Sequence, residues 1–550
     1  MTEGLRRARW RAGRLPTIRA VGSLVRTFPL VLLDGPTALA IARGEARGAR
    51  DPRMLPLLDR ALARRRIPGL VRRRAEILES AGEPTKARAA WLELAAVGDE
   101  HAARRARVAE ARLVETDLTW LPRAVRPGTP VERLEPAGRG RVLHLLKSSV
   151  PDRWAGFTIR TMHNLRAQRA AGLDPVAVTE IGWPRVVGIT AFDERVEVEG
   201  ILHLRLDRGP GYDLSAIPVD EQLRDNVADL AAVVRDVRPA ILHAHSGHRG
   251  GEHALMALAI REQFGIPVVY EVRGLFEAVW SSDPEAAERS ELFARRLAQE
   301  TRILREVDGI VAISETLADD IVARGIERSR IAVVPNGIDA DAFVEAPRDE
   351  ALRRELGLAG RFAVGYVGNL DHWREGIDVL IAAIAELHRR GRREVTGLVV
   401  GDGSGRDALE AQARRLGIAD QVRFTGRVPH DDVPRYYAQF DLFTSPRVEE
   451  RAARFITPLK PYEAMALGRP LLVSDLPALA EIVDPPHRGH VARAGDPIAF
   501  ADAVEALLDD PDERERIARA GRDWVRRERT WASNGPRYRA AYERIVGPID

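Results

Sequence analysis

Residues 457–468 combine side chains that bind phosphate and sugar hydroxyls. Thr457 is a typical N-cap residue, Pro458 favours the first position of a helix and Gly468 favours its end, so a short helix between two strands is expected here. The free N–H groups and the dipole at such a helix start attract an anion. Glu463 lies one turn further, among apolar residues, where a carboxylate needs a partner such as a ribose hydroxyl. The alternative is a surface glutamate on an ordinary helix.

Glycines and an arginine follow the other apolar runs of the second half. At the carboxyl ends of parallel strands, such residues allow backbone to approach a ligand and a guanidinium to pair with a diphosphate. Their order along the chain predicts a nucleotide-diphosphate site, although Arg374 alone could equally be a solvated surface arginine. The candidate binding residues are Asn369, Arg374, Gly403, Gly426, Arg427, Val428, Thr457, Pro458 and Leu459.

The first half carries polar residues at strand ends as well. Gly156 permits close backbone approach before a helix, which is a second anion-binding type of turn. His243 and His245 alternate along a strand and face one side. Without a third ligand in the sequence nearby, a metal site is disfavoured, which leaves a polar wall for an acceptor or buried structural histidines. Glu271 and Arg273 are expected to form an ion pair.

These residues need parallel sheets to bring them together. Short apolar runs alternate with helical stretches from residue 141 onward, and the pattern restarts near residue 360. We therefore predict an α/β protein with two Rossmann-like doubly wound domains and a cleft between them. The domains span 141–345 and 346–530, and residues 531–550 form a C-terminal helix that crosses back to the first domain.

The first 122 residues differ in composition. They are predicted to be a basic α-helical region, joined by a proline- and glycine-rich linker at 123–140. Gly82, Pro84, Ala87 and Trp91 fit one helical hairpin of the tetratricopeptide type, with a generic helical bundle as the alternative.

Charge is unevenly distributed along the chain. Residues 1–140 hold 28 lysines and arginines against 16 acidic residues, whereas the remainder holds 56 against 65. This asymmetry favours either an anionic partner for the front region or a simple compositional bias toward arginine. In residues 1–50, basic and apolar side chains interleave, so a helix there could lie on an anionic membrane surface or pack on the domain that follows.

Several classes of protein are excluded by composition. The 550-residue chain contains no cysteine, which rules out disulfides, thiolate metal sites and a cysteine nucleophile. The basic N-terminus lacks the apolar core of a signal peptide, and no stretch is apolar enough to cross a bilayer. A cytoplasmic protein, peripheral at the inner face of the plasma membrane through its front region, is the expectation.

The ordered motifs resemble those of retaining, nucleotide-sugar-dependent glycosyltransferases of the GT-B fold, the group 1 (family 4-like) enzymes, and in particular a subset associated with exopolysaccharide assembly. The resemblance covers about residues 141–545. The segments that carry it are 155–161, 266–275, 335–339, 367–370, 400–403, 424–429, 441–443 and 457–468.

The resemblance implies roles for individual residues. Glu463 would bind the ribose, residues 457–459 the sugar and diphosphate, Lys460 the phosphates, and 426–428 the base. Gly156 would lie under the diphosphate from the first domain, with His245 and Arg273 on the acceptor side.

The resemblance also implies the reaction. A hexose would pass from a UDP- or GDP-sugar to a lipid-linked or polysaccharide acceptor with retention, without a cofactor, a metal or nucleic acid. The sequence does not name the sugar, the base or the acceptor.

The sequence departs from the family pattern at four positions. Phe455 replaces a second glutamate, Asn369 replaces an arginine, Glu375 replaces a lysine and Arg273 replaces a histidine. The exopolysaccharide-associated subset shares several of these changes. The alternative function is therefore a catalytically weak GT-B scaffold that recruits partners to a polysaccharide assembly through its helical front region.

Overall fold

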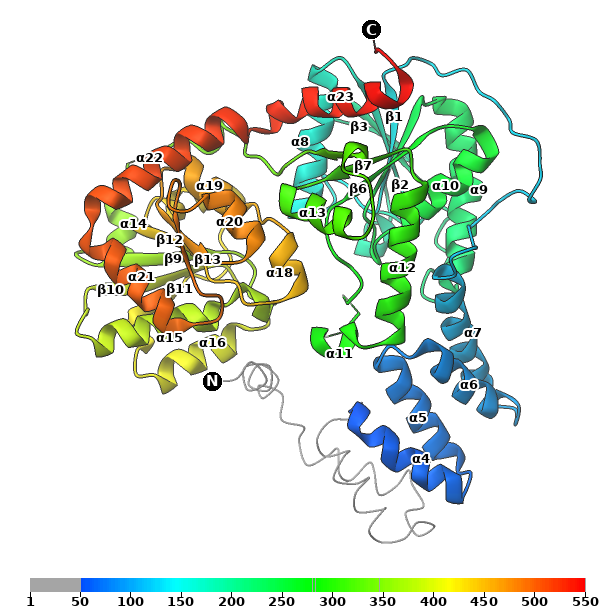
Figure 1. The fold of residues 1–550 in the computed structure, drawn as a ribbon, viewed down its shortest axis with the longest axis horizontal. Coiled ribbons are helices and arrows are strands. Elements are labelled where there is room, and N and C mark those ends of the chain that lie inside the picture. The colour runs from blue at the N-terminus through cyan, green and yellow to red at the C-terminus, as the bar shows by residue number, and fades with distance from the viewer. Residues whose placement is uncertain (1–50, 279, 282, 346, 550) are drawn as a thin grey trace. The chain divides into compact units, whose positions relative to one another are not determined.

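The computed structural model describes residues 51–549 apart from 279, 282 and 346. It is an α/β protein with two β-sheets preceded by a helical region, as the sequence predicts (Figure 1). By internal contacts the described chain divides into two compact units: residues 51–152 with 174–310, and residues 153–173 with 311–549. The predicted membrane-binding segment, residues 1–50, lies outside the described residues.

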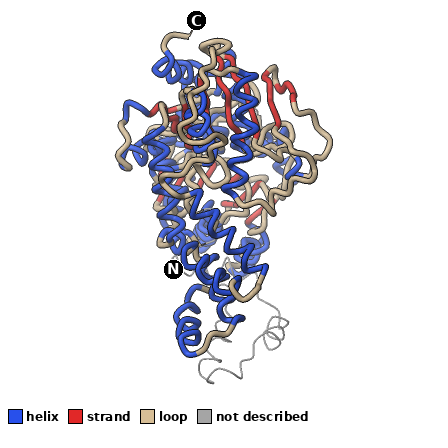
Figure 2. The backbone as a smooth tube through the Cα atoms, turned by 90° about the vertical axis from the view of Figure 1, so that its right-hand side faces the viewer, coloured by secondary structure: helices blue, strands red, loops and turns tan. Residues whose placement is uncertain are grey.

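Residues 51–120 contain helices and loops without a strand, as Figures 1 and 2 show. A helical hairpin is present at the predicted place: its two helices, α5 and α6, are joined by a turn at Gly82, while its tetratricopeptide type stays a prediction. Ala87 and Trp91 are buried between the helices, as expected from their sizes. The helices of this region are α4 (Leu55–Arg64), α5 (Pro68–Ser80), α6 (Pro84–Ala95) and α7 (Glu100–Glu115).

The hairpin packs on the helix α12 (Glu291–Glu306) of the same unit. The Leu292 amide donates to the Gly82 carbonyl, and the Thr85 hydroxyl donates to Glu291 at 2.5 Å. Gly82 has a φ of +74° and lies under the Trp280 ring, so a side chain there would meet the indole. The helical region is thereby fixed to the part of the first unit that contains α12.

The first sheet has the strand order β3-β4-β2-β1-β5-β6-β7-β8. The pairings of β1 with β2 and β5, of β2 with β4 and of β5 with β6 are parallel, while the edge strand β3 pairs antiparallel with β4. The strands β3 and β4 were not predicted from the sequence pattern. The strands are β1 (Arg141–Leu146), β2 (Asp174–Thr179), β3 (Arg195–Val198), β4 (Ile201–Arg205), β5 (Ile241–His245), β6 (Val268–Val272), β7 (Gly309–Ala312) and β8 (Ile331–Val333).

Helices surround the strands of this half of the chain. The helix α10 packs on β1, β5 and β6, and α9 packs on α10 and α7. The helices are α8 (Gly156–Ala170), α9 (Val219–Val237), α10 (Glu252–Phe264), α11 (Pro284–Glu288), α12 and α13 (Glu315–Ala323).

The second sheet is parallel throughout and has the order β11-β10-β9-β12-β13-β14. Two apolar clusters fill its faces, one against α15 and α21 and the other against α19 and α20. The strands are β9 (Phe362–Val367), β10 (Val395–Val400), β11 (Val422–Phe424), β12 (Leu442–Ser445), β13 (Leu471–Ser474) and β14 (His490–Ala492). The helices of this half are α14 (Glu350–Glu355), α15 (Ile377–Arg389), α16 (Arg406–Arg415), α17 (Val433–Tyr437), α18 (Arg451–Phe455), α19 (Lys460–Ala466), α20 (Pro477–Val483), α21 (Pro497–Asp509) and α22 (Pro511–Glu528).

The chain ends in the helix α23 (Asn534–Val546), which packs on α8 and β8. Asn164 of α8 donates to the Tyr538 hydroxyl at 3.1 Å and accepts from Asn534 at 2.9 Å, and all three residues are buried. Among the described residues, no helix is both long and apolar enough to span a bilayer.

Candidate functional site

The helix predicted at residues 457–468 forms, but it begins later than expected. It starts at Lys460, with Leu459 at the N-cap and Pro461 in the first turn, instead of at Pro458. Thr457 does not cap it. Its carbonyl accepts from the Asn336 amide at 2.9 Å, which fixes the preceding loop instead. Two prolines in four residues explain the shift, because either one is compatible with a helix start.

Glu463 is partly buried on this helix and is held by a tyrosine. The Tyr437 hydroxyl donates to Glu463 Oε2 at 2.7 Å. Burial, together with the Glu463 charge, raises the pKa of Tyr437 well above its usual 10, so the phenol stays protonated as a donor. The carboxylate is therefore orientated before any ligand arrives. Nothing in the sequence pattern pointed to Tyr437, which is 26 residues away.

Lys460 is the centre of a buried charged network. Its Nζ donates to the Tyr366 hydroxyl at 3.0 Å and lies 3.6 Å from Glu375. Glu375 in turn pairs with Arg447 at 3.0 Å, and both side chains are less than one tenth exposed. Burial opposes ionisation of Glu375, yet Arg447, Lys460 and Arg374 hold its pKa well below the usual value. The charge of Glu375, which stands at the family's lysine position, is thus compensated by the buried Arg447. Nothing in the sequence pattern indicated this arginine.

Two glycines allow the backbone to approach this network closely. Gly368 has a φ of +153°, and a Cβ there would lie 2.4 Å from Lys460 Nζ. A Cβ on Gly403 would lie 2.6 Å from the Asp371 amide nitrogen. The ends of β9 and β10 are consequently packed side by side, with no room for side chains. The Asn369 side chain accepts a hydrogen bond from the Asp371 amide at 2.5 Å and so stabilises the turn in which it lies.

The remaining predicted donor residues lie at neighbouring strand ends. Gly426, with a φ of +74°, accepts from the Gly401 amide at 3.1 Å, which ties the end of β11 to that of β10. Arg427 is exposed and Val428 half-buried. Arg374 lies in a turn just before α15, 3.9 Å from Glu375.

The start of α8 belongs to the same compact unit as α19. A Cβ on Gly156 would lie 3.5 Å from Leu459 Cδ1. Arg160 of α8 donates to the carbonyls of Val334 and Pro335 at 2.7 and 2.9 Å. It also donates to Asn336, the residue that holds Thr457. Gly156 of α8 and the segment from Thr457 to Lys460 therefore lie in one neighbourhood.

The acceptor-side candidates lie in the other unit. Arg273 pairs with Glu271 at 2.7 Å, as expected, and Glu271 also contacts His243 at 3.1 Å. His245 is buried, and burial, with the charge of Arg273, lowers its pKa well below the usual 6.5. His144 Nδ1 lies 2.9 Å from His245 Nε2. The structure thus adds a third histidine to the pair seen in the sequence.

Two serines that follow β1 were also not indicated by the sequence pattern. The hydroxyls of Ser148 and Ser149 are buried and have no hydrogen-bond partner among the described residues. Buried polar groups are usually paired, so these two are candidates for contact with water or a polar ligand.

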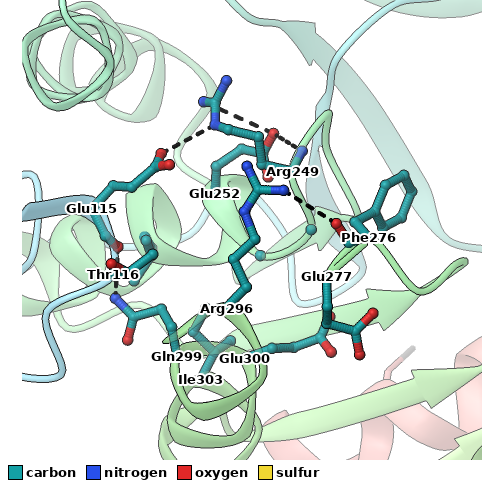
Figure 3. A pocket seen from close by; sticks show the side chains of 13 residues that line it. Glu115, Thr116, Arg249, Glu252, Phe276, Glu277, Arg296, Gln299, Glu300 and Ile303 are labelled. Carbon is teal, nitrogen blue, oxygen red and sulfur yellow. Dashed lines mark hydrogen bonds and ion pairs between the residues drawn. The ribbon is translucent and has the colours of Figure 1, made fainter. Parts of the chain in front are cut away.

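A pocket in the first unit contains none of the predicted site residues (Figure 3). It encloses about 40 Å³, room for a few water molecules. Arg249 bonds Glu115 of α7 at 3.1 Å, and Gln299 donates to the Glu115 carbonyl at 2.9 Å. Burial raises the pKa of Glu115, although Arg249 opposes the shift. These contacts hold α7 against the loop that precedes α10 and against α12, so the pocket lies where the helical region meets the rest of the first unit.

Comparisons with known proteins match both halves of the chain. Residues 155–337 match the model of the glycosyl transferase 4-like domain, and residues 361–510 match that of the glycosyl transferases group 1. The 2-deoxystreptamine glucosyltransferase of Streptomyces kanamyceticus is 32% identical over 257 residues, which are 46% of this chain and 64% of that protein. The alpha-D-kanosaminyltransferase of the same organism is 30% identical over 293 residues, 51% of this chain and 70% of that protein. The chain spans 57–64% of the length of the first four curated relatives it matches.

Solved structures share the fold. The sucrose-phosphate synthase of Thermosynechococcus elongatus superposes with a TM-score of 0.60 at 21% identity, covering 74% of this chain and 98% of that one. The Anabaena HepE protein in complex with UDP-glucose superposes with a TM-score of 0.56 at 18% identity, covering 74% and 100%. The two family models and the relative that is 30% identical over 70% of its length assign the family, and the solved structures share the fold. The chain therefore belongs to the glycosyl transferases group 1 family and has the GT-B fold.

Proposed function

We propose that the protein is a retaining glycosyltransferase that moves a hexose from a UDP- or GDP-sugar to a lipid-linked or polysaccharide acceptor in cell-surface polysaccharide synthesis. The observation that carries the proposal is the orientated Glu463 carboxylate beside Lys460 on α19. Curated relatives named as glycosyltransferases and a fold neighbour in complex with UDP-glucose support a nucleotide-sugar donor.

The residues around Lys460 have defined tasks in this proposal. Glu463 accepts hydrogen bonds from the ribose, and residues 426–428 flank the base. Lys460 and Arg374, with the N–H groups at the starts of α8 and α19, stabilise the charge that grows on the leaving nucleotide diphosphate. Fixed positive charge of this kind serves the purpose without a metal ion or another cofactor.

The acceptor side rests on His245 and Arg273. The two side chains are mostly buried, and Arg273 is fixed by Glu271, so both are rigid groups. In the proposal they contact the acceptor hydroxyl together with groups such as Ser148 and Ser149. Residues 1–50 add peripheral attachment to an anionic membrane at the cytoplasmic face, where a lipid-linked acceptor would be found.

A panel of nucleotide sugars tests the proposal. Thermal denaturation with each UDP- and GDP-hexose identifies the donor, because a ligand of the folded state raises the melting temperature. NMR of the product made from that donor then gives the anomeric configuration. Retention is expected, and an inverted product would refute the retaining assignment.

A second candidate function is a catalytically weak scaffold in a polysaccharide assembly. The observation that favours it is Phe455, which replaces a glutamate of the family pattern. Its ring lies 5.3 Å from the Arg451 guanidinium and 5.8 Å from that of Arg454, so an aromatic ring contacts these arginines where the family pattern has a carboxylate. Donor binding without hydrolysis or transfer, combined with capture of a partner by residues 51–120, would support this reading over the first.

A further inference from the structure

Three histidines lie on one face of the first sheet. His144 of β1 is directly opposite His243 of β5, and His245 follows two residues later on the same face of β5. All three side chains are buried, with exposed fractions of 0%, 0% and 4%. They are carried by hydrogen-bonded neighbouring strands, which are among the most rigid positions that a fold offers.

The rings are close enough to share one ion. One ring nitrogen from each histidine lies within 4.8 Å of the other two. His144 Nδ1 and His245 Nε2 are 2.9 Å apart. Two imidazole nitrogens bound to one Zn²⁺ at about 2.0–2.1 Å lie roughly 3 Å apart, so this pair already has the required spacing. A rotation of the His243 ring would bring its nitrogen into range, because the three ring centroids are only 4.7–5.2 Å apart.

The surroundings of the cluster resemble the outer shell of metal sites. A ligating histidine usually donates its second N–H to a carboxylate, which fixes the ring. Glu271 of β6 lies directly opposite His245 and contacts His243 Nε2 at 3.1 Å. With Nε2 facing Glu271, the ligand atom of His243 in such a site would be Nδ1. Glu271 is itself fixed by Arg273 at 2.7 Å.

The outer shell of the cluster is open at His245. Its Nδ1 atom is buried and has no hydrogen-bond partner among the described residues. An ion bound at Nε2 would not pair this second nitrogen, so Nδ1 is a place for a water molecule or another polar group.

We propose that His144, His243 and His245 form a binding site for one divalent transition-metal ion of the class that prefers imidazole ligands, such as Zn²⁺ or Co²⁺. Carboxylate-preferring ions such as Mg²⁺ and Ca²⁺ do not fit this all-nitrogen set. The site shares His245 with the acceptor side of the proposed function and contains none of the residues around Lys460, and its existence does not depend on sugar transfer.

The test uses the full-length protein, stripped of metal with a chelator, and Co²⁺ as the probe. We expect one equivalent of Co²⁺ to bind with a visible absorption band and to raise the melting temperature. Zn²⁺ should displace it, and Mg²⁺ should not. His144→Gln should lower the affinity for Co²⁺ by at least about 100-fold, and Glu271→Gln, which changes only the outer shell, by about 10- to 100-fold.

His487→Gln is the matched control, because this histidine is exposed and far along the chain from the cluster. It should bind Co²⁺ like the wild type. Equal binding by the wild type, His144→Gln and His487→Gln would overturn the site, since the ion would then be held by surface histidines. If His144→Gln fails to fold, X-ray absorption of the Zn²⁺-loaded wild type decides: three imidazole ligands support the site, and fewer than three contradict it.

Discussion

The Tyr437 hydroxyl donates a 2.7 Å hydrogen bond to the Glu463 carboxylate, across 26 residues of sequence. We predict that Tyr437→Phe weakens binding of the nucleoside diphosphate about 5- to 10-fold, the effect of losing about 1 kcal/mol of positioning. Calorimetric titration with UDP and GDP measures this. Tyr212→Phe removes a similar 2.7 Å bond to Asp225 in the other unit and should leave nucleotide affinity unchanged. Equal losses in the two variants would mean that the Tyr437 effect is a general loss of stability.

The buried pair of Glu375 and Arg447 gives a prediction on stability. Arg447→Met should destabilise the fold by about 3–5 kcal/mol, because it leaves a buried carboxylate with less compensation. Adding Glu375→Gln should recover much of that loss. Urea unfolding followed by circular dichroism is the measurement. Arg389→Met, which breaks a pair with Glu386 where the arginine is 72% exposed, should cost under about 1 kcal/mol. A double variant no more stable than Arg447→Met would argue against charge as the cause.

The close approach of the Gly368 backbone to Lys460 is tested by substituting two glycines, one beside Lys460 and one far from it. Gly368→Ala should displace the Lys460 ammonium, since the new Cβ would lie 2.4 Å from Nζ, and nucleotide affinity should fall at least about 10-fold. Gly391 also has a positive φ, of +93°, and an alanine Cβ there would have nothing within 4 Å. Both variants should lose about 1 kcal/mol of stability from the strained backbone, but only Gly368→Ala should lose affinity. If Gly368→Ala bound the nucleotide as tightly as the wild type, Lys460 would not be part of the phosphate site.

The ionisation of Glu180 makes the stability of the first unit depend on pH. Burial opposes its ionisation, yet hydrogen bonds from His248 and His253 hold the pKa of Glu180 at about 2. Because this pKa lies below that of the unfolded chain, the carboxylate stabilises the fold above about pH 4.5, and the contribution is lost as the pH falls toward 2. Glu180→Gln should therefore lower stability at pH 7 by up to about 3 kcal/mol and flatten the decline between pH 5 and about 3.

Urea unfolding at a series of pH values measures the effect of Glu180. The control is Glu197→Gln at an exposed position of β3, which should keep the wild-type profile. If the free energy of unfolding of Glu180→Gln fell as steeply with falling pH as that of the wild type, other acidic groups would be responsible for the loss of stability in acid.

Much of the fold could be predicted from the sequence because parallel strands are continuous apolar runs. Residues 142–146 and 363–367 stand out in this way, and each forms a central strand. The edge strand β3 could not be found in this way, because it is short, polar and partly exposed. Its neighbour β4 was missed although it is mostly apolar and buried. The start of α19 was misplaced because two prolines competed for it.

The candidate site was predictable only where its residues are near in sequence. Thr457, Lys460 and Glu463 belong to one segment, so their spacing was visible. Tyr437 and Arg447, which orient Glu463 and Glu375, contact them only after folding. His144 is 101 residues from His245, and only the pairing of β1 with β5 brings them together. Supporting residues of this kind come from tertiary contacts that a local pattern does not contain.

The central claim is that α19 binds the ribose and diphosphate of a nucleotide sugar. Calorimetric titration of UDP and GDP into the wild type and Glu463→Ala tests it most directly. We predict micromolar-range binding of one nucleotide by the wild type and a loss of at least about 30-fold in the variant, since a hydrogen-bonded charged group is worth about 2 kcal/mol or more. Equal affinity of the two proteins for that nucleotide, with both correctly folded, would contradict the account.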